Sequence, residues 1–90
     1  MRYEWDERKN ASNLEKHGVA FEAILEAAWD RALIAQDTRM DYAEVPFQAY
    51  VPIRHRLYVV VYVHRKNVRR IISLRKANPR ERNRYEQTHF

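Results

Sequence analysis

Tyrosine, arginine and serine side chains interleave along two apolar segments of the C-terminal half, residues 57–63 and 68–75. Phenol rings can stack on nucleobases and guanidinium groups can bind phosphate oxygens bidentately, so this composition suits a single-stranded RNA ligand. Without a metal, the reaction open to these groups is attack of a ribose 2′-hydroxyl on its own phosphodiester. That reaction needs a proton acceptor, a cation beside the developing charge and a proton donor for the leaving 5′ oxygen. Arg65, Arg75 and Lys76 could supply the charge, and His17, His64, Glu81 or Tyr85 could move protons.

The same residue types also have structural explanations, which stay open at this stage. An isolated arginine on a small domain is more often a solvated surface residue than a ligand contact, and a tyrosine can fill the edge of a sheet. Ser73 lies within an apolar stretch and is interpreted as a packing residue. Three functions therefore remain: an RNA-cleaving enzyme, a non-catalytic RNA-binding or regulatory module that uses the same basic surface, and a basic dock for an acidic protein partner.

The composition narrows the chemistry. The chain has 90 residues with one glycine and no cysteine, so we expect one domain, residues 1–90. A disulfide, a zinc ribbon, a thiol nucleophile and a glycine-rich phosphate loop are excluded. The four histidines show no metal-ligand spacing: His17, His55, His64 and His89. We therefore expect neither a metal nor another cofactor.

Charge is unevenly distributed along the chain. Residues 1–53 carry six basic and ten acidic side chains, a balance of −4, whereas residues 54–90 carry eleven basic and two acidic side chains, a balance of +9. A basic block of this density suits a polyphosphate or a strongly acidic protein, because cations that contact phosphates release condensed counterions. No stretch approaches the roughly 18 apolar residues of a transmembrane helix, and the acidic, aromatic start is unlike a secretory signal. We therefore expect a soluble cytoplasmic protein without membrane contact.

Capping signals and periodicity predict the elements that must position these residues. Asp6 and Gly18 delimit a predicted helix over residues 7–17, and an i, i+3, i+4, i+7, i+8 apolar pattern over residues 21–29 predicts a second helix. Strands are predicted at residues 2–5, 32–35, 47–51, 57–63 and 68–75, and Asn78-Pro79-Arg80-Glu81 opens a last helix with a capping box. This order predicts an α+β fold in which an antiparallel β-sheet carries two N-terminal helices and a C-terminal helix.

The last two strands form a predicted antiparallel hairpin, and its register decides which residues share a face. A two- or four-residue turn at Lys66-Asn67, with Asn67 able to adopt the left-handed conformation, pairs Tyr62 with Ile71 and Tyr58 with Arg75. One face is then an apolar core: Leu57, Val59, Val61, Val63, Ile72 and Leu74. The other face is the candidate site: Tyr58, Tyr62, His64, Arg69, Ser73 and Arg75. A three- or five-residue turn would shift the pairing by one residue, and the all-apolar first face favours the former register.

Together these residues resemble the BrnT toxins, a family with a RelE-like fold. The N-terminal match consists of Trp5-Asp6, Lys9, Asn13, Lys16-His17-Gly18-Val19 and Phe21. The C-terminal match consists of Val60-Val61-Tyr62, Arg65, Arg70-Ile71-Ile72-Ser73, Arg75-Lys76-Ala77, Glu81-Arg82 and Tyr85, and the middle segment matches at Asp37, Arg39, Asp41-Tyr42 and Glu44. The chain differs where the family has glycines, at Ala43 and in the turns near Pro52 and at Lys66-Asn67.

The resemblance implies a RelE-like fold and a metal-independent endoribonuclease that blocks translation and is neutralised by a BrnA-like antitoxin. It also implies that operator DNA is bound only indirectly, through a ribbon-helix-helix domain of that antitoxin. The catalytic candidates are Arg65 and Arg75 as phosphate and transition-state contacts, followed by Lys76, Glu81, Tyr85 and His17. The RNA-binding candidates are Lys16, Tyr62, His64, Arg69 and Arg70. His17 has a second interpretation, in which it only interacts with the last carbonyls of its helix.

Overall fold

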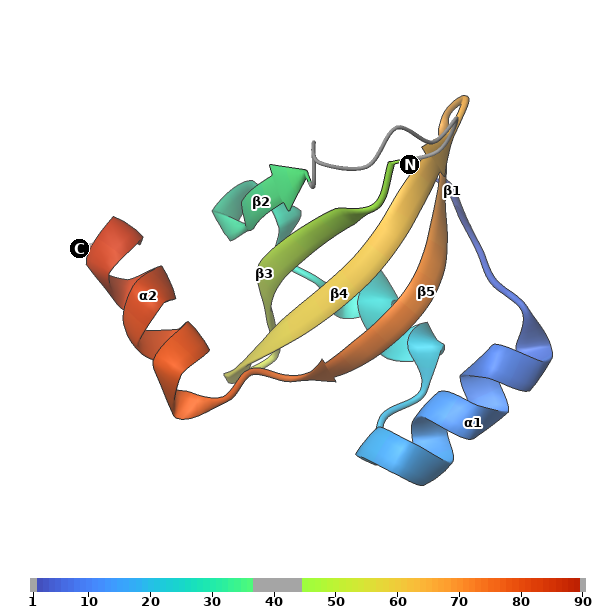
Figure 1. Ribbon diagram of the computed structural model, residues 1–90, viewed down its shortest axis with the longest axis horizontal. Coiled ribbons are helices and arrows are strands. Elements are labelled where there is room, and N and C mark those ends of the chain that lie inside the picture. Colours follow the sequence, from blue (N-terminus) through green and yellow to red (C-terminus); the bar gives the residue numbers. More distant parts are fainter. Residues whose placement is uncertain (1, 37–44, 90) are drawn as a thin grey trace.

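The computed structural model describes residues 2–36 and 45–89, which form a five-stranded sheet flanked by helices (Figure 1). Its elements are β1 (Arg2–Glu4), α1 (Glu7–His17), the 3-10 helices η1 (Phe21–Glu26) and η2 (Trp29–Arg31), β2 (Leu33–Gln36), β3 (Phe47–Ile53), β4 (Arg56–Arg65), β5 (Val68–Lys76) and α2 (Pro79–His89). The strand order is β1-β5-β4-β3-β2. Strand β1 runs parallel to β5, and the other neighbouring strands are antiparallel.

This arrangement confirms the predicted α+β fold class, with two differences in detail. The sheet is mixed because β1 is parallel to β5. The second N-terminal helix is a pair of 3-10 helices, because Ala27 adopts an extended conformation, forms a bridge with Ile53 and so interrupts the helix. The next amide, of Ala28, donates to the carbonyl of Pro52 at 2.9 Å. Tertiary hydrogen bonds to β3 therefore outweigh the helical periodicity of this segment.

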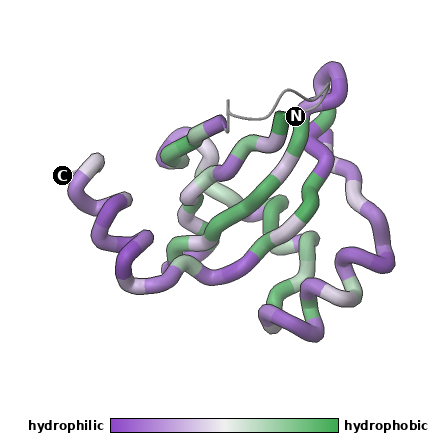
Figure 2. Tube along the Cα trace, viewed as in Figure 1, coloured by the Kyte–Doolittle hydropathy of each residue, from purple (hydrophilic) through white to green (hydrophobic). Residues whose placement is uncertain are grey.

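The two faces of the sheet are covered very differently. One face of the sheet, called here the core face, is covered by η1. Phe21 and Ile24 of η1 pack there against strand residues that are nearly inaccessible to solvent: Ala49, Val51, Ile53, Val60, Tyr62, Ile71 and Leu74. The opposite face, called here the α2 face, has a smaller buried cluster made of Tyr50, Val59 and Tyr85. Figure 2 shows apolar colour along much of the strands and hydrophilic colour along α2.

The hairpin of β4 and β5 begins in the predicted register and then departs from it. His64 pairs with Arg69 and Tyr62 with Ile71, as expected for a two-residue turn, but Val61 pairs with Ser73 and leaves Ile72 as an extra residue. Beyond this bulge the register is shifted by one, so Arg75 pairs with Val59 instead of Tyr58. The predicted faces are therefore wrong in two respects: Tyr62 lies on the core face, and Arg75 lies beside Val59 on the α2 face.

A buried amide closes the open edge of β5. Strand β1 pairs only with residues 68–70, and further along the edge Asn13 of α1 takes the place of a neighbouring strand. Its side chain donates to the carbonyl of Leu74 at 2.7 Å and to that of Val19 at 2.9 Å, and it accepts from the amide of Leu74 at 3.1 Å. The predicted ends of α1 are also found: Asp6 caps it, and Gly18 closes it with a φ of 71°.

Both hairpin turns use a left-handed residue that is not glycine. Arg54 has a φ of 59° and Lys66 a φ of 58°. The left-handed residue of the second turn is therefore Lys66, and the prediction that it would be Asn67 is wrong. The family-like middle segment, which includes Asp37, Tyr42 and Ala43, lies outside the described residues. Within the described part of the chain the α-helices have 11 residues each, which is too short for a bilayer-spanning helix.

Candidate active site

The corner between β5 and α2 holds a guanidinium and a carboxylate in a bidentate pair. Nη1 and Nη2 of Arg75 each lie 2.8 Å from an oxygen of Glu81. The local sequence explains this placement, because Asn78 and Glu81 form the predicted capping box at the start of α2. The Asn78 amide donates to Glu81 at 2.9 Å, and the Glu81 amide donates to the Asn78 side chain at 2.8 Å. The capping box therefore holds the Glu81 carboxylate in place, and this carboxylate in turn orients the Arg75 guanidinium.

The electrostatics of this pair favour its charged form. The hydrogen bond from Arg75, together with that from the Asn78 amide, holds the pKa of Glu81 below its usual value of 4.5. The same contact with Glu81 raises the pKa of Arg75. Glu81 is consequently ionised and occupied by donors near neutral pH, which suits it to positioning Arg75 and makes it a poor proton acceptor.

Arg75 keeps one edge of its guanidinium available. Of its five N–H donors, two on separate nitrogens bind Glu81, and the second donor of Nη1 points to the carbonyl of Lys76 at 3.3 Å. The Nε donor and the remaining Nη2 donor share one edge and have no acceptor among the described residues. The side chain is 35% exposed. This edge has the spacing that binds two oxygens of one phosphate.

Tyrosine side chains and a second arginine surround the pair on the α2 face. Tyr50 packs with Val59 and Tyr85, and Val59 is the cross-strand neighbour of Arg75. Arg84 reaches the Tyr50 hydroxyl at 3.5 Å. Tyr85 is only 7% exposed, and its hydroxyl donates to the carbonyl of Arg31 at 2.7 Å. Tyr85 therefore anchors α2 to the sheet.

The other catalytic candidates do not join this corner. Arg65 lies at the opposite end of the hairpin, six residues along β4 from Val59, which corresponds to roughly 20 Å. Lys76 pairs with Tyr58 and lines a separate hollow beside Gly18, on the core-face side of the sheet. His17 ends α1, directly before that glycine, and is exposed. The structure thus brings together Arg75, Glu81 and Tyr85 and leaves Arg65, Lys76 and His17 elsewhere.

Most of the RNA-binding candidates have partners within the fold. Arg70 binds Glu4 of β1 at 2.6 Å, and Arg69 lies over the Trp29 ring with its guanidinium carbon 3.6 Å from the ring centroid. Tyr62 is 1% exposed, so its predicted role in stacking on a base is not supported; burial also raises its pKa. His64 is exposed at the turn end of β4, and its ring contacts those of Phe47 and Tyr62 edge to face. Lys16 is exposed in the last turn of α1.

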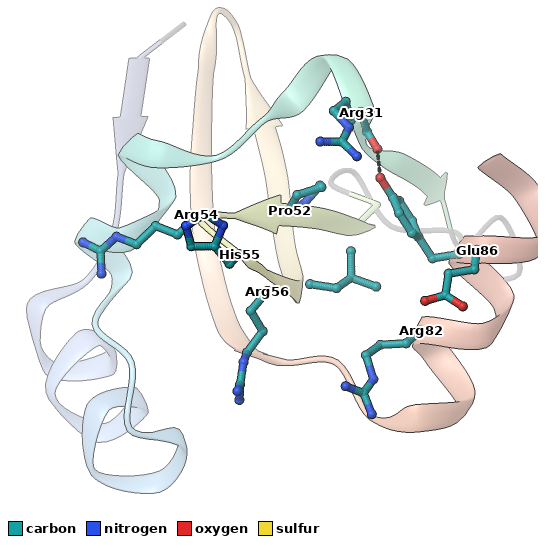
Figure 3. Close-up of a pocket in the computed structure, with 9 residues that line it drawn as sticks. Arg31, Pro52, Arg54, His55, Arg56, Arg82 and Glu86 are labelled. Carbon is teal, nitrogen blue, oxygen red and sulfur yellow. Dashed lines mark hydrogen bonds between the residues drawn. The ribbon is translucent and has the colours of Figure 1, made fainter. Parts of the chain in front are cut away.

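A groove beside this corner contains residues that sequence reasoning missed. It lies between the β3–β4 turn and α2, and Arg31, Arg56 and Arg82 surround it (Figure 3). The net charge of +9 in the C-terminal half was the sequence signal that could have pointed to Arg56 and Arg82. No sequence pattern connects these two residues to Arg31 of η2. Among the described residues, no three His, Asp or Glu side chains come together as a metal site.

Comparisons with known proteins agree with the fold and with the family resemblance. A family model described as the ribonuclease toxin BrnT of a type II toxin-antitoxin system matches residues 5–81. Among solved structures, the chain is similar to the crystal structure of the Brucella abortus ribonuclease toxin BrnT, with 24% identity and a TM-score of 0.59. That match covers 87% of this chain and 97% of the other. Curated protein sequences give no match.

Proposed function

The chain belongs to the BrnT family of ribonuclease toxins from type II toxin-antitoxin systems, and on this basis we propose that it cleaves RNA without a metal, with Arg75 on the scissile phosphate. In this reaction the ribose 2′-oxygen forms a bond to phosphorus while the bond to the 5′-oxygen breaks. The 2′-hydroxyl loses its proton and the leaving 5′-oxygen gains one, so the products carry a 2′,3′-cyclic phosphate and a 5′-hydroxyl. The protein must mainly supply charge stabilisation at phosphorus.

The observation that carries this proposal is the oriented, half-occupied guanidinium of Arg75. Its end-on donors are held by Glu81 at 2.8 Å, while its other edge has no acceptor among the described residues. A donor pair that is already oriented needs little reorganisation as charge develops on the phosphate oxygens. Glu81 is a positioning residue in this scheme, and Tyr85 holds α2 in place. Phosphate contacts by Arg65 and Lys76 and proton transfer by His17 stay predictions.

The family supports a cellular role as well. A type II toxin implies a cognate antitoxin and an RNA substrate, and we propose that this chain inhibits translation by cleaving RNA in the cytoplasm. A BrnA-like antitoxin would neutralise it, and contact with operator DNA would pass through that antitoxin. The exposed arginines of α2, Arg80, Arg82 and Arg84, provide a basic surface for an acidic segment of such a partner.

The test is cleavage of a single-stranded RNA in the presence of EDTA. Wild-type protein should produce fragments with 2′,3′-cyclic phosphate ends. Arg75→Ala should lower the cleavage rate by about 10²–10³-fold because an oriented donor pair is lost. Arg75→Lys should recover only part of the rate, since an ammonium cannot bind Glu81 and a phosphate in the same bidentate way.

Arg80→Ala is the matched control, because Arg80 is exposed on α2 and takes no part in the Arg75–Glu81 pair. Its rate should equal that of the wild type. RNA that stays intact at micromolar protein would contradict the enzymatic proposal, and binding without cleavage would favour the non-catalytic RNA-binding module. Equal rates for Arg75→Ala and wild type would remove Arg75 from the mechanism.

A further inference from the structure

The groove next to the Arg75–Glu81 corner has the size and lining of a nucleotide subsite. Its volume is about 560 Å³, within the range of small-molecule pockets. Pro52, Leu57 and Tyr85 supply apolar surface, and arginine side chains stand around them. Figure 3 shows that the groove opens between the β3–β4 turn and α2, so its two walls come from segments far apart in the sequence.

Three guanidinium groups at this groove are available to an anion. Arg31, Arg56 and Arg82 are exposed and form no ion pair with any described residue. Arg54 also borders the groove, but its guanidinium turns away and binds Glu26 at 2.5 Å (Figure 3). The side chains of Arg56 and Arg82 extend in the same direction, one from each wall. Two cations that face one opening in this way suit a phosphate between them.

A single carboxylate distinguishes this groove from a general anion site. Glu86 lines it, one helical turn after Arg82. A carboxylate can accept a hydrogen bond from the exocyclic amino group of a base, and an acidic side chain offers no such donor. Apolar and aromatic surface beside it suits the face of that base. These observations favour a nucleotide over an acidic peptide.

The groove and the catalytic corner share Tyr85 as a neighbour. Tyr85 lines the groove and packs against Val59, whose cross-strand partner is Arg75. A strand of RNA with one phosphate at Arg75 can therefore place an adjoining nucleotide in the groove.

We propose that this groove binds a nucleotide of the substrate RNA next to the cleaved bond, with Arg56 and Arg82 on its phosphate and Glu86 on the amino group of its base. The inference rests on the proposed RNA-cleaving function. It assigns substrate affinity and base preference to residues outside the Arg75–Glu81 pair. Arg31, on η2, contributes to the positive field of the groove.

The first experiment measures binding of 2′-O-methyl RNA hexamers, which cannot be cleaved because their nucleophile is blocked. Fluorescence anisotropy at several salt concentrations compares wild type with the Arg56→Ala/Arg82→Ala double variant. The double variant should bind at least about tenfold more weakly, and its salt slope should fall by roughly 0.7, which is the contribution of one neutralised phosphate on a single strand. The control is Arg8→Ala/Arg80→Ala, which removes the same charge from exposed positions outside the groove. It should change affinity less than about threefold.

The second experiment tests the role of Glu86 with cytidine and uridine hexamers, which differ in an amino group and a carbonyl at the same ring position. Wild type should bind the cytidine hexamer about five- to tenfold more tightly, because the carboxylate accepts from the amino group and repels the carbonyl oxygen. Glu86→Gln should bind both equally, since an amide can donate as well as accept. Glu86 is exposed, so this substitution should leave the melting temperature within a few degrees of the wild type.

The outcomes separate this inference from the proposed function. If wild type cleaves RNA in EDTA but the groove variant binds with the affinity and salt slope of the control, the groove inference is wrong and the proposed function stands. If wild type neither binds nor cleaves RNA, both are wrong. If a hexaglutamate peptide binds wild type and loses affinity for the groove variant while RNA does not, the groove is a dock for an acidic peptide and the inference is overturned.

Discussion

The two faces of the sheet differ in how many apolar side chains they bury and in which charged groups they expose. Among the described residues, the buried cluster on the core face contains ten apolar side chains, whereas the cluster on the α2 face contains three. At about 1.5–3 kcal/mol for each large buried side chain, most of the hydrophobic stabilisation comes from the core face. The smaller cluster leaves room on the α2 face for the Arg75–Glu81 pair and the arginines around the groove. Charged groups can be exposed there because the fold does not depend on that face being apolar.

Polar groups show the same division. On the core-face side, Asn13 uses its side chain to satisfy backbone groups of Leu74 and Val19. On the α2 face, Arg75 keeps two donors without an acceptor among the described residues, and Arg56 and Arg82 at the groove make no ion pair within that part of the chain. Saturated polar groups hold a structure together, and unsaturated ones at the surface are available to a ligand.

The largest effect is expected from truncation of the core-face cluster. Phe21 is fully buried and contacts Trp5 edge to face at 6.0 Å between ring centroids. Phe21→Ala should lower the free energy of unfolding by about 3–5 kcal/mol, as lost burial and a cavity add up. Urea denaturation measures this change in the free energy of unfolding. A loss below about 1 kcal/mol would show that the core-face cluster does not dominate stability.

The next effect concerns the amide that closes the edge of β5. Asn13→Ala should cost about 2–4 kcal/mol, because it leaves the amide and carbonyl of Leu74 buried without partners. Denaturation and amide hydrogen exchange at Leu74 are the measurements. Asn83→Ala, at an exposed position of α2, is the control and should change stability by less than about 0.5 kcal/mol. Unchanged exchange at Leu74 would contradict the edge-closing role.

A smaller effect is expected on the α2 face. Tyr85→Phe removes the hydroxyl that donates to the carbonyl of Arg31, which should cost about 1 kcal/mol. Hydrogen exchange should accelerate mainly in α2 and around η2, because the bond joins these two elements. Tyr58→Phe is the matched control, since Tyr58 lies on the other side of the sheet. Faster exchange throughout the molecule would show that the two faces are not independent.

The smallest effect is the pH dependence of the Arg75–Glu81 pair. Because the pKa of Glu81 is lowered by Arg75, the pair stabilises the fold above the usual carboxyl value of 4.5 and loses this contribution as pH falls through the lowered pKa. Glu81→Gln should cost no more than about 1 kcal/mol at neutral pH, because Arg75 is 35% exposed and solvent screens the pair. Thermal melts between pH 3 and pH 7 should show the difference disappearing at the acidic end. A difference that grows on acidification would reverse the assigned sign.

Local signals predicted much of the framework, and long-range packing explains the failures. The capping box at Asn78 and Glu81 depends on residues three apart, and the cap at Asp6 and the end at Gly18 are also local. The second helix was predicted wrongly in its type, because the bridge from Ala27 to Ile53 joins residues 26 positions apart. The prediction that Arg75 shares a face with Tyr58 and Tyr62 is wrong, because a single bulge at Ile72 reverses the alternation beyond it.

By itself, the sequence determined the element order, the helix ends, the concentration of positive charge in the second half and the family resemblance, because each depends on composition or on residues close together in the chain. Only the tertiary structure decided that Arg75 shares a face with Tyr85, that Asn13 completes the edge of β5, and that Arg31 joins Arg56 and Arg82 at one groove. These contacts depend on strand register and on how η2 and α2 pack against the sheet. Register is set by the packing of both faces at once, and a periodic apolar pattern does not encode where a bulge will interrupt it.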